Sequence, residues 1–142
     1  MQIFIACDHA AFEAKEALKA ALAALHQVTD LGTHSLESVH YPEYASKLSL
    51  NVLSHPDSMG ILLCGSGIGV SIAANRFIGI RAALCRDIED ANMSRSHNNA
   101  NVLCLGARRN SLDELKAMVS AFLSTPFQGG RHATRVQMID GV

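Results

Sequence analysis

A cysteine stands directly in front of a glycine-rich turn near the middle of this sequence. Cys64 ends a short apolar run and precedes Gly65-Ser66-Gly67-Ile68-Gly69, and residues 70–76 have the pattern of a helix. Glycines that alternate across a strand-to-helix turn leave backbone N–H groups free to converge on an anion. The amides and the helix dipole both favour the thiolate form of the cysteine. A base beside an anion-binding turn is what enolisation next to a carbonyl requires.

Other interpretations of the same turn remain open. A glycine-rich strand–turn–helix is also typical of loops that bind nucleotide phosphates. The dinucleotide pattern G-x-G-x-x-G is not met, because Val70 stands where the third glycine belongs, and no G-x-x-x-x-G-K-[ST] occurs. A cysteine at the end of a strand is often only a small buried apolar residue. The turn therefore predicts an anion site, and the role of Cys64 depends on its neighbours.

Composition excludes several classes of protein. The chain of 142 residues is predicted to form a single domain, residues 1–142, with 49% apolar residues and a net charge of −1. Neither this charge nor the few aromatic residues favours binding of nucleic acid. No apolar run approaches the ~20 residues of a membrane helix, and the first residues lack the basic segment of a signal peptide. We therefore expect a cytoplasmic protein that contacts neither nucleic acid nor membrane.

The cysteines and histidines lack the spacing of metal ligands. Cys7, Cys64, Cys85 and Cys104 are all predicted on strands, and no pair has the C-x-x-C spacing. No two histidines lie four residues apart on a helix beside a carboxylate. The sequence thus predicts neither disulfide bonds nor a metal ion.

Strand and helix patterns alternate five times along the chain. Strands are predicted at 3–7, 28–31, 59–63, 80–85 and 102–105, each followed by a helical pattern. Near-continuously apolar strands separated by helices indicate a parallel sheet with helices on both faces. Leu25 is predicted to extend the buried face of the first helix, and Ser111 and Glu114 to form a capping box. After Gly129-Gly130 the sequence continues as a basic tail.

Ligands of such sheets lie beyond the carboxyl ends of the strands, and this rule selects polar residues at that edge. Asp8 and His9 follow the first strand, the glycine turn follows the third, and Arg108 and Arg109 follow the fifth. The pair Asp8-His9 fits either a helix N-cap with a neutral neighbour or a carboxylate–imidazole pair for proton transfer. We expect these groups to converge at one edge of the sheet.

Two further polar groups lie away from that edge in the sequence. His97 and Asn98 precede the fifth strand, which assigns them to the amino edge of their own sheet, roughly 17 Å from the carboxyl edge. If His97 acts at the site, it must therefore act in the site of another subunit. Arg131 and Arg135 are four residues apart and share a helical face, which fits either a solvated basic tail or a grip on one phosphate.

Together these segments resemble the type B ribose-5-phosphate isomerases and the related galactose-6-phosphate isomerase subunits. The resemblance runs from Ile3 to Arg135 and rests on Cys7-Asp8-His9-Ala10-Ala11-Phe12, Tyr41-Pro42, Cys64-Gly65-Ser66-Gly67-Ile68-Gly69, Ala73-Ala74-Asn75-Arg76-Phe77, Gly79-Ile80-Arg81-Ala82, Ser96-His97-Asn98, Asn101-Val102-Leu103 and Gly129-Gly130-Arg131-His132. It implies an α/β fold, a Rossmann-like three-layer α/β/α sandwich with a five-stranded parallel sheet and an extended basic C-terminal tail. It also implies a homodimer or tetramer with shared active sites, no metal and no cofactor.

The resemblance implies that the chain interconverts ribose 5-phosphate and ribulose 5-phosphate through an enediolate. Cys64 is the implied base, and His97 with Asp8 opens the sugar ring. Ser66 and the amides of Gly65, Gly67, Ile68 and Gly69 hold the enediolate oxygen; His9, Arg131 and Arg135 bind phosphate with Arg108 nearby; Tyr41 and Asn98 contact sugar hydroxyls. Some relatives use a glutamate as base at the position that Val70 occupies here, so only the cysteine version fits this chain.

Two other functions remain compatible with the sequence. One is a hexose-6-phosphate isomerase, acting on allose or galactose 6-phosphate, as a subunit of a hetero-oligomer; retention of Cys64, His97, Arg131 and Arg135 in one chain weighs against an unlike partner. The other is a non-catalytic module that binds a phosphosugar or nucleotide, which leaves Asp8 without a role. The tail, residues 129–142, is expected to dock on the site or on the partner subunit.

Overall fold

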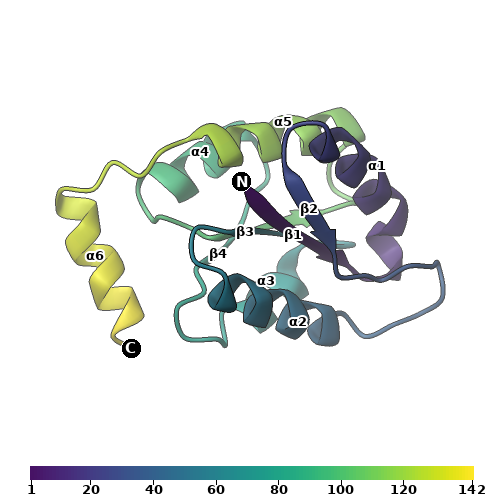
Figure 1. Ribbon diagram of the computed structural model, residues 1–142, viewed down its shortest axis with the longest axis horizontal. Coiled ribbons are helices and arrows are strands. Elements are labelled where there is room, and N and C mark those ends of the chain that lie inside the picture. The colour runs from purple at the N-terminus through teal and green to yellow at the C-terminus, as the bar shows by residue number, and fades with distance from the viewer.

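Five parallel strands in the order β2-β1-β3-β5-β4 form the centre of the molecule (Figure 1). The computed structural model describes all residues from 1 to 142. The strands are β1 (Gln2–Cys7), β2 (Gln27–Asp30), β3 (Met59–Cys64), β4 (Ala82–Leu84) and β5 (Val102–Gly106). The chain winds to one side from β1 to β2 and to the other side from β3 onwards. The carboxyl ends of β1 and β3 therefore flank the position where such sheets bind ligands.

Helices cover both faces of the sheet, so the predicted three-layer sandwich is confirmed. The helices α1 (Phe12–Ala23), α4 (Ile88–Ser96) and α5 (Leu112–Ser124) lie on one face, and α2 (Tyr41–Ser54) and α3 (Ile68–Ala74) lie on the other (Figure 1). Side chains alternate along β1, with Ile3 and Ile5 packed in one apolar cluster and Phe4 and Ala6 in the second. No helix combines the length and apolar character that a membrane-spanning segment needs.

The predicted ends of helices and strands agree with the structure where a capping motif marks them, and differ from it where only hydrophobic periodicity indicates them. Ser111 and Glu114 form the expected capping box of α5. Leu25, by contrast, is 81% exposed, because α1 ends at Ala23 before it reaches that position. β4 is shorter than predicted, and α3 begins at Ile68, two residues earlier than predicted.

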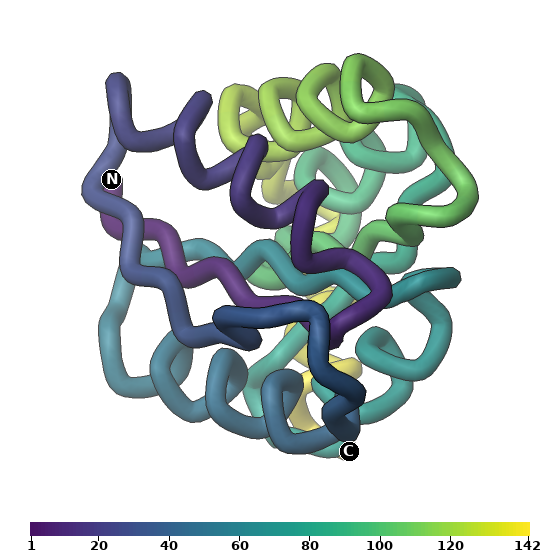
Figure 2. Tube along the Cα trace, turned by 90° about the vertical axis from the view of Figure 1, so that its right-hand side faces the viewer, coloured from purple at the N-terminus to yellow at the C-terminus, as the bar shows by residue number.

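The C-terminal tail contains a helix, on which Arg131 and Arg135 lie one turn apart. Residues Arg131–Asp140 form α6, which stands beside the amino edge of the sheet, away from the layers (Figure 1). Figure 2 looks toward the opposite, carboxyl edge, and α6 lies behind the sheet in that view. Asp140 pairs with Arg81 at 2.8 Å and Val136 is buried. The two glycines directly before α6 both have positive φ, a conformation that glycine adopts without strain.

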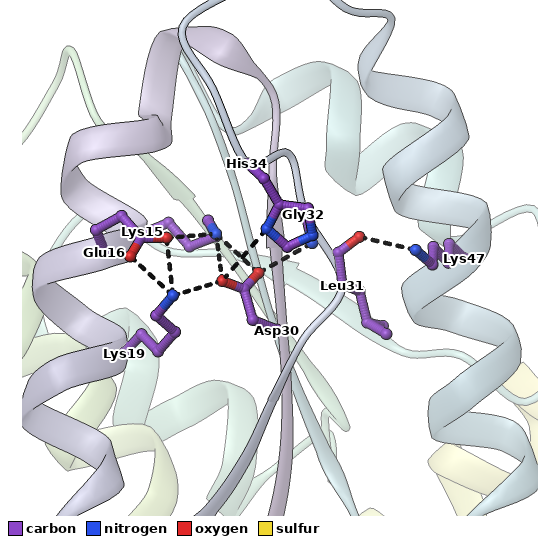
Figure 3. A network of polar contacts seen from close by, with 8 residues as sticks. All are labelled: Lys15, Glu16, Lys19, Asp30, Leu31, Gly32, His34 and Lys47. Carbon is purple, nitrogen blue, oxygen red and sulfur yellow. Dashed lines mark hydrogen bonds and ion pairs between the residues drawn. The ribbon is translucent and has the colours of Figure 1, made fainter.

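A buried lysine ties α1 to the end of β2 (Figure 3). The side chain of Lys15 is fully buried, and its Nζ donates to both carboxylate oxygens of Asp30, at 2.7 and 2.6 Å. Glu16 and Lys19 extend the network on the solvent side, at 2.8 Å from Lys15 and from Asp30 respectively. A buried charge is tolerated only when it is paired in this way. The network therefore fixes where β2 ends relative to α1.

The chain leaving β2 is held from both sides. Asp30 Oδ1 accepts the N–H of Gly32 at 2.9 Å, and the carbonyl of Leu31 accepts from Lys47 of α2 at 3.1 Å (Figure 3). This segment leads to Val39, whose N–H contacts His9 beyond β1. The ion pair at Asp30 thus supports the loop that reaches the carboxyl edge.

Acid is expected to weaken the fold through Asp30. Burial acts to raise the pKa of Asp30, but the hydrogen bonds from Lys15 and Lys19 outweigh it and lower the pKa from 3.8 to about 2. A carboxyl whose pKa is lowered by folding stabilises the folded state above its ordinary pKa, and this stabilisation is lost as the pH falls toward 2. We expect the free energy of unfolding to drop over that range. Asp30→Asn should lower it by about 3 kcal/mol at neutral pH, because Lys15 loses its main partner.

Chemical denaturation at a series of pH values measures both effects. Glu37→Gln, a change at an exposed loop carboxylate, is the matched control and should leave the acid dependence unchanged. An Asp30→Asn protein with wild-type stability at neutral pH would contradict the role of the ion pair.

Candidate active site

A cavity of about 710 Å³ opens at the carboxyl edge of the sheet, beyond the ends of β1, β3 and β5. Its position at the change of winding direction agrees with the general rule for parallel α/β sheets. Residues from four separate segments line it: Asp8, His9, Ala10, Tyr41, Cys64, Gly65, Ser66, Ile68, Gly69, Ile72, Arg108 and Arg109. The residues predicted at this edge are therefore brought together.

The turn after β3 depends on glycine at two positions. Gly67 has φ +77°, a left-handed conformation that favours glycine, and directly precedes α3. A Cβ at Gly67 would lie 2.9 Å from the main-chain carbon of Leu105. A Cβ at Gly69 would lie 2.6 Å from the ring of Tyr41. The missing side chains let the turn lie directly on β5 and under the tyrosine.

The Cys64 sulfur accepts a hydrogen bond from within this turn. The Gly67 N–H donates to Cys64 Sγ at 3.1 Å, and the Ile68 N–H donates to Ser66 Oγ at 3.2 Å. Two amides of the turn thus face electron-rich atoms at the cavity. A donor aimed at a sulfur favours its thiolate form.

The other three cysteines are held as thiols. Burial raises the pKa of Cys7 to about 12 and that of Cys85 to about 11, and burial also raises the pKa of Cys104. All four cysteines are unpaired, so no disulfide forms. Only Cys64 among them lines the cavity.

Asp8 and His9 present a carboxylate and an imidazole to the same cavity. Asp8 Oδ1 accepts the Ala10 N–H at 3.0 Å and so caps a short 3₁₀ turn, His9–Ala11. Both sequence interpretations of Asp8 are therefore compatible, since one carboxylate oxygen caps and the residue still lines the cavity. His9 Nδ1 accepts the Val39 N–H at 3.1 Å, which leaves Nε2 to carry the hydrogen of the neutral ring. His9 can therefore donate from Nε2 to an anion.

Two residues that the sequence reasoning missed hold the turn from outside. Gly106 ends β5, and a Cβ there would lie 2.7 Å from the main-chain carbon and oxygen of Ser66. Arg86 Nη1 donates to the carbonyl oxygen of Ser66 at 2.7 Å. A glycine directly after an apolar strand is a signal that could have indicated Gly106. No sequence pattern indicates Arg86, because its partner is a main-chain atom 20 residues away.

Four predicted site residues lie at the amino edge instead. His97 and Asn98 follow α4, and Arg131 and Arg135 belong to α6; none of them lines the cavity. The rings of His97 and His132 stack at 4.4 Å between centroids, with 8° between their planes. Within one chain, this group and Cys64 are therefore at opposite edges of the sheet.

Positive charge is concentrated around the stacked rings. Loss of hydration lowers the pKa of His132, and electrostatic repulsion from the neighbouring His97, Arg131 and Arg135 lowers it further. Neither arginine forms an ion pair with a carboxylate. The cluster is thus suited to receive an anion from outside the chain.

The fold and the cavity define an α/β protein that presents a cysteine beside a glycine-rich turn. The chain belongs to the Ribose/Galactose Isomerase family, whose model matches residues 3–139. It is 43% identical to ribose-5-phosphate isomerase B of Escherichia coli (strain K12) over 142 residues, which cover 99% of this chain and 95% of that protein. The family resemblance seen in the sequence is confirmed, and the chain is an isomerase.

Two solved structures extend the comparison to three dimensions. A ribose 5-phosphate isomerase from Thermotoga maritima is 53% identical, with a TM-score of 0.96 over 99% of this chain and 98% of that one. Ribose-5-phosphate isomerase B from Mycoplasma genitalium, with bound ribulose-5-phosphate, is 38% identical, with a TM-score of 0.95 over 99% of this chain and 94% of that one.

Gly106→Ala is expected to disturb the turn without removing any chemical group. The added Cβ would meet main-chain atoms of Ser66, which cannot rotate aside, so the turn must move. A displacement of this kind is expected to lower isomerase turnover at least ~tenfold. Turnover and thermal unfolding are measured together. Gly141→Ala is the control, since its Cβ would meet two carbonyl oxygens at the ordinary contact distances of 3.4 and 3.8 Å. Unchanged turnover in Gly106→Ala would show that the contact does not position the turn.

Proposed function

We propose that this protein interconverts ribose 5-phosphate and ribulose 5-phosphate through an enediolate, with Cys64 as the base and without a metal. The observation that carries the proposal is the Cys64 sulfur at the cavity, with the Gly67 N–H donated to it at 3.1 Å. The names of the relatives support the substrate, and one related structure contains ribulose-5-phosphate. We also propose that the protein is located in the cytoplasm, because four unpaired cysteines fit a reducing compartment.

The chemical step is a proton transfer between neighbouring carbons. The Cys64 thiolate removes the proton from C2 of the open-chain aldose, and the electrons move onto the C1 oxygen to form the enediolate. The proton on the C2 hydroxyl moves to the neighbouring C1 oxygen. The Cys64 thiol then returns its proton to C1, which leaves a C1 hydroxyl and a C2 carbonyl and completes the ketose. Ser66 and the amides of Gly65–Gly69 hold the developing oxyanion, because fixed dipoles stabilise charge best where water is excluded.

The phosphate lies at the far end of the open-chain sugar. A second anion beside the thiolate would oppose its formation, so the phosphate is bound at a distance. His9 donates from Nε2, and the guanidinium of Arg108, which packs over Gly65, lies at the same cavity. Tyr41 packs on Gly69 and contacts sugar hydroxyls. These groups bind one end of the substrate and leave C1 and C2 near Cys64.

The remaining groups come from a second copy of the chain. His97 opens the furanose ring with the aid of Asp8, Asn98 contacts a hydroxyl, and Arg131 and Arg135 complete the phosphate site. Their position at the edge opposite Cys64 supports this arrangement, because one chain cannot present both groups to one sugar. The tail, residues 129–142, then docks on the partner subunit, and the dimer is the smallest active unit.

Cys64→Ser is expected to remove isomerisation while the fold persists. Serine is close to cysteine in size but is a much weaker base, so turnover of ribose 5-phosphate should fall about a hundredfold or more. Turnover is measured as the rate of ketose formation. Allose 6-phosphate and unphosphorylated ribose serve as comparison substrates, and ribose 5-phosphate should be preferred. EDTA should have no effect on the wild type. Cys85→Ser, at a buried thiol away from the cavity, should remain active; full activity of Cys64→Ser would refute the assignment of the base.

Complementation between two inactive variants tests the shared site. When Cys64→Ser and His97→Asn chains are mixed and re-equilibrated, a heterodimer contains one intact site, so about a quarter of wild-type activity should return. The control mixes wild type with the chain that carries both changes, whose heterodimers have no intact site. Shared sites predict that this mixture falls to about a quarter of wild-type activity, whereas sites within one chain predict a half. Failure of the first mixture to recover would exclude the shared site.

A further inference from the structure

Arg86 connects the segment after β4 to the turn that carries Cys64. Its Nη1 donates to the Ser66 carbonyl oxygen at 2.7 Å, a short distance typical of charged hydrogen bonds. Its backbone is itself fixed, since the Arg86 N–H donates to Asp90 at 3.0 Å and its carbonyl accepts from Asn110 at 3.0 Å. The backbone of Arg86 is thus held by α4 on one side and by the residues after β5 on the other, and its guanidinium is held by the Ser66 carbonyl.

The carbonyl that Arg86 binds belongs to the same peptide unit as the Gly67 N–H. In a trans peptide the C=O and N–H bonds point in opposite directions. The oxygen end of the Ser66–Gly67 peptide therefore faces Arg86, while its hydrogen end donates to Cys64 Sγ at 3.1 Å. A cation at the oxygen end also polarises the peptide and strengthens the hydrogen bond at the other end.

The positive charge of Arg86 is not neutralised by an ion pair. No carboxylate lies within ion-pair distance of its guanidinium. It also lines a second cavity of about 520 Å³, on which four acidic side chains lie: Asp87, Glu89, Asp113 and Glu114. The Ser66 carbonyl is the one hydrogen-bond acceptor of the guanidinium in this structure.

We propose that Arg86 is a positioning residue of the isomerase reaction, which fixes the Ser66–Gly67 peptide with its N–H aimed at the Cys64 sulfur and strengthens that hydrogen bond by its charge. The assignment rests on the proposed role of Cys64 as the base. Arg86 does not line the cavity that contains Cys64, so it acts through the peptide and not on the substrate. When the positive charge of Arg86 is removed, the Cys64 thiolate forms less readily.

The pH profile of Cys64 alkylation measures this effect directly. Iodoacetamide reacts with the thiolate, and peptide mass spectrometry distinguishes Cys64 from the other three cysteines. Loss of the charge in Arg86→Gln or Arg86→Met should move the midpoint of the profile upward by about half a unit to one unit. Arg86→Lys, which keeps the charge, should remain closer to the wild type. The other charged or titratable groups near the sulfur are unchanged in all these variants. Asp8, His9, Tyr41, Arg108 and Arg109 line the same cavity, and Cys104 of β5 packs in the same apolar cluster as Cys64.

Lys116→Gln is the matched control, because it removes one positive charge from an exposed position on α5. Its profile should coincide with that of the wild type. Below the midpoint, kcat for ribose 5-phosphate should fall about three- to tenfold in Arg86→Gln with KM nearly unchanged, since no substrate contact is lost. A purely structural role would lower thermal stability without moving the alkylation midpoint.

The Gly67 amide proton gives a second, independent measurement. In the wild type its NMR chemical shift should titrate with the same midpoint as Cys64 alkylation, and in Arg86→Gln it should move upfield. An unchanged midpoint in Arg86→Gln and Arg86→Met, an equal shift in Lys116→Gln, or a Gly67 proton that does not titrate with Cys64 would overturn the proposal. Alkylation and NMR require no turnover, so a wild type inactive on sugar phosphates would refute the proposed function and still leave Arg86 tested.

Discussion

The close approach of two main-chain segments is the constraint on which the site depends. The turn after β3 lies against the end of β5, and the N–H groups of Ala107 and Arg108 donate to the carbonyls of Cys64 and Gly65 at 2.9 and 3.0 Å. Gly106 leaves no side chain between the two segments. This contact aims the thiol, the amides and Arg108 at one cavity, because each is attached to a backbone that has no freedom to move alone.

The sheet and the carboxyl-edge residues could be predicted from the sequence for one reason. Near-continuously apolar strands require helices on both faces, and a parallel sheet directs every strand end to the same edge. Asp8 directly follows β1, and Cys64 is itself the last residue of β3, so their convergence follows from topology alone. The interpretation of the glycine motif needed no knowledge of its distant neighbours, since the turn conformation is local.

The features that could not be predicted depend on partners distant in the chain. Lys15 follows Phe12 and Ala14 in an amphipathic helix and carries no signal of burial, because its partner Asp30 is supplied by the next strand. Arg86 contacts a main-chain oxygen, and any residue type at position 66 would offer that atom. The helical tail was visible as a shared face of Arg131 and Arg135, but its place beside His97 is a tertiary contact.

The different environments of the four cysteines determine the order in which oxidants attack them. Peroxides attack thiolates, so the thiols of Cys7, Cys85 and Cys104, whose pKa values burial raises, are protected. Cys64 is also buried, with 4% of its surface exposed, but it lines the cavity, so we expect sulfenic acid to form there first. The other three cysteines lie within the layers of the sandwich and are at most 1% exposed. Oxidation of the cysteines is therefore expected to begin at the carboxyl edge of the sheet and to leave the packed interior intact, and a small reducing thiol can reverse its first stage.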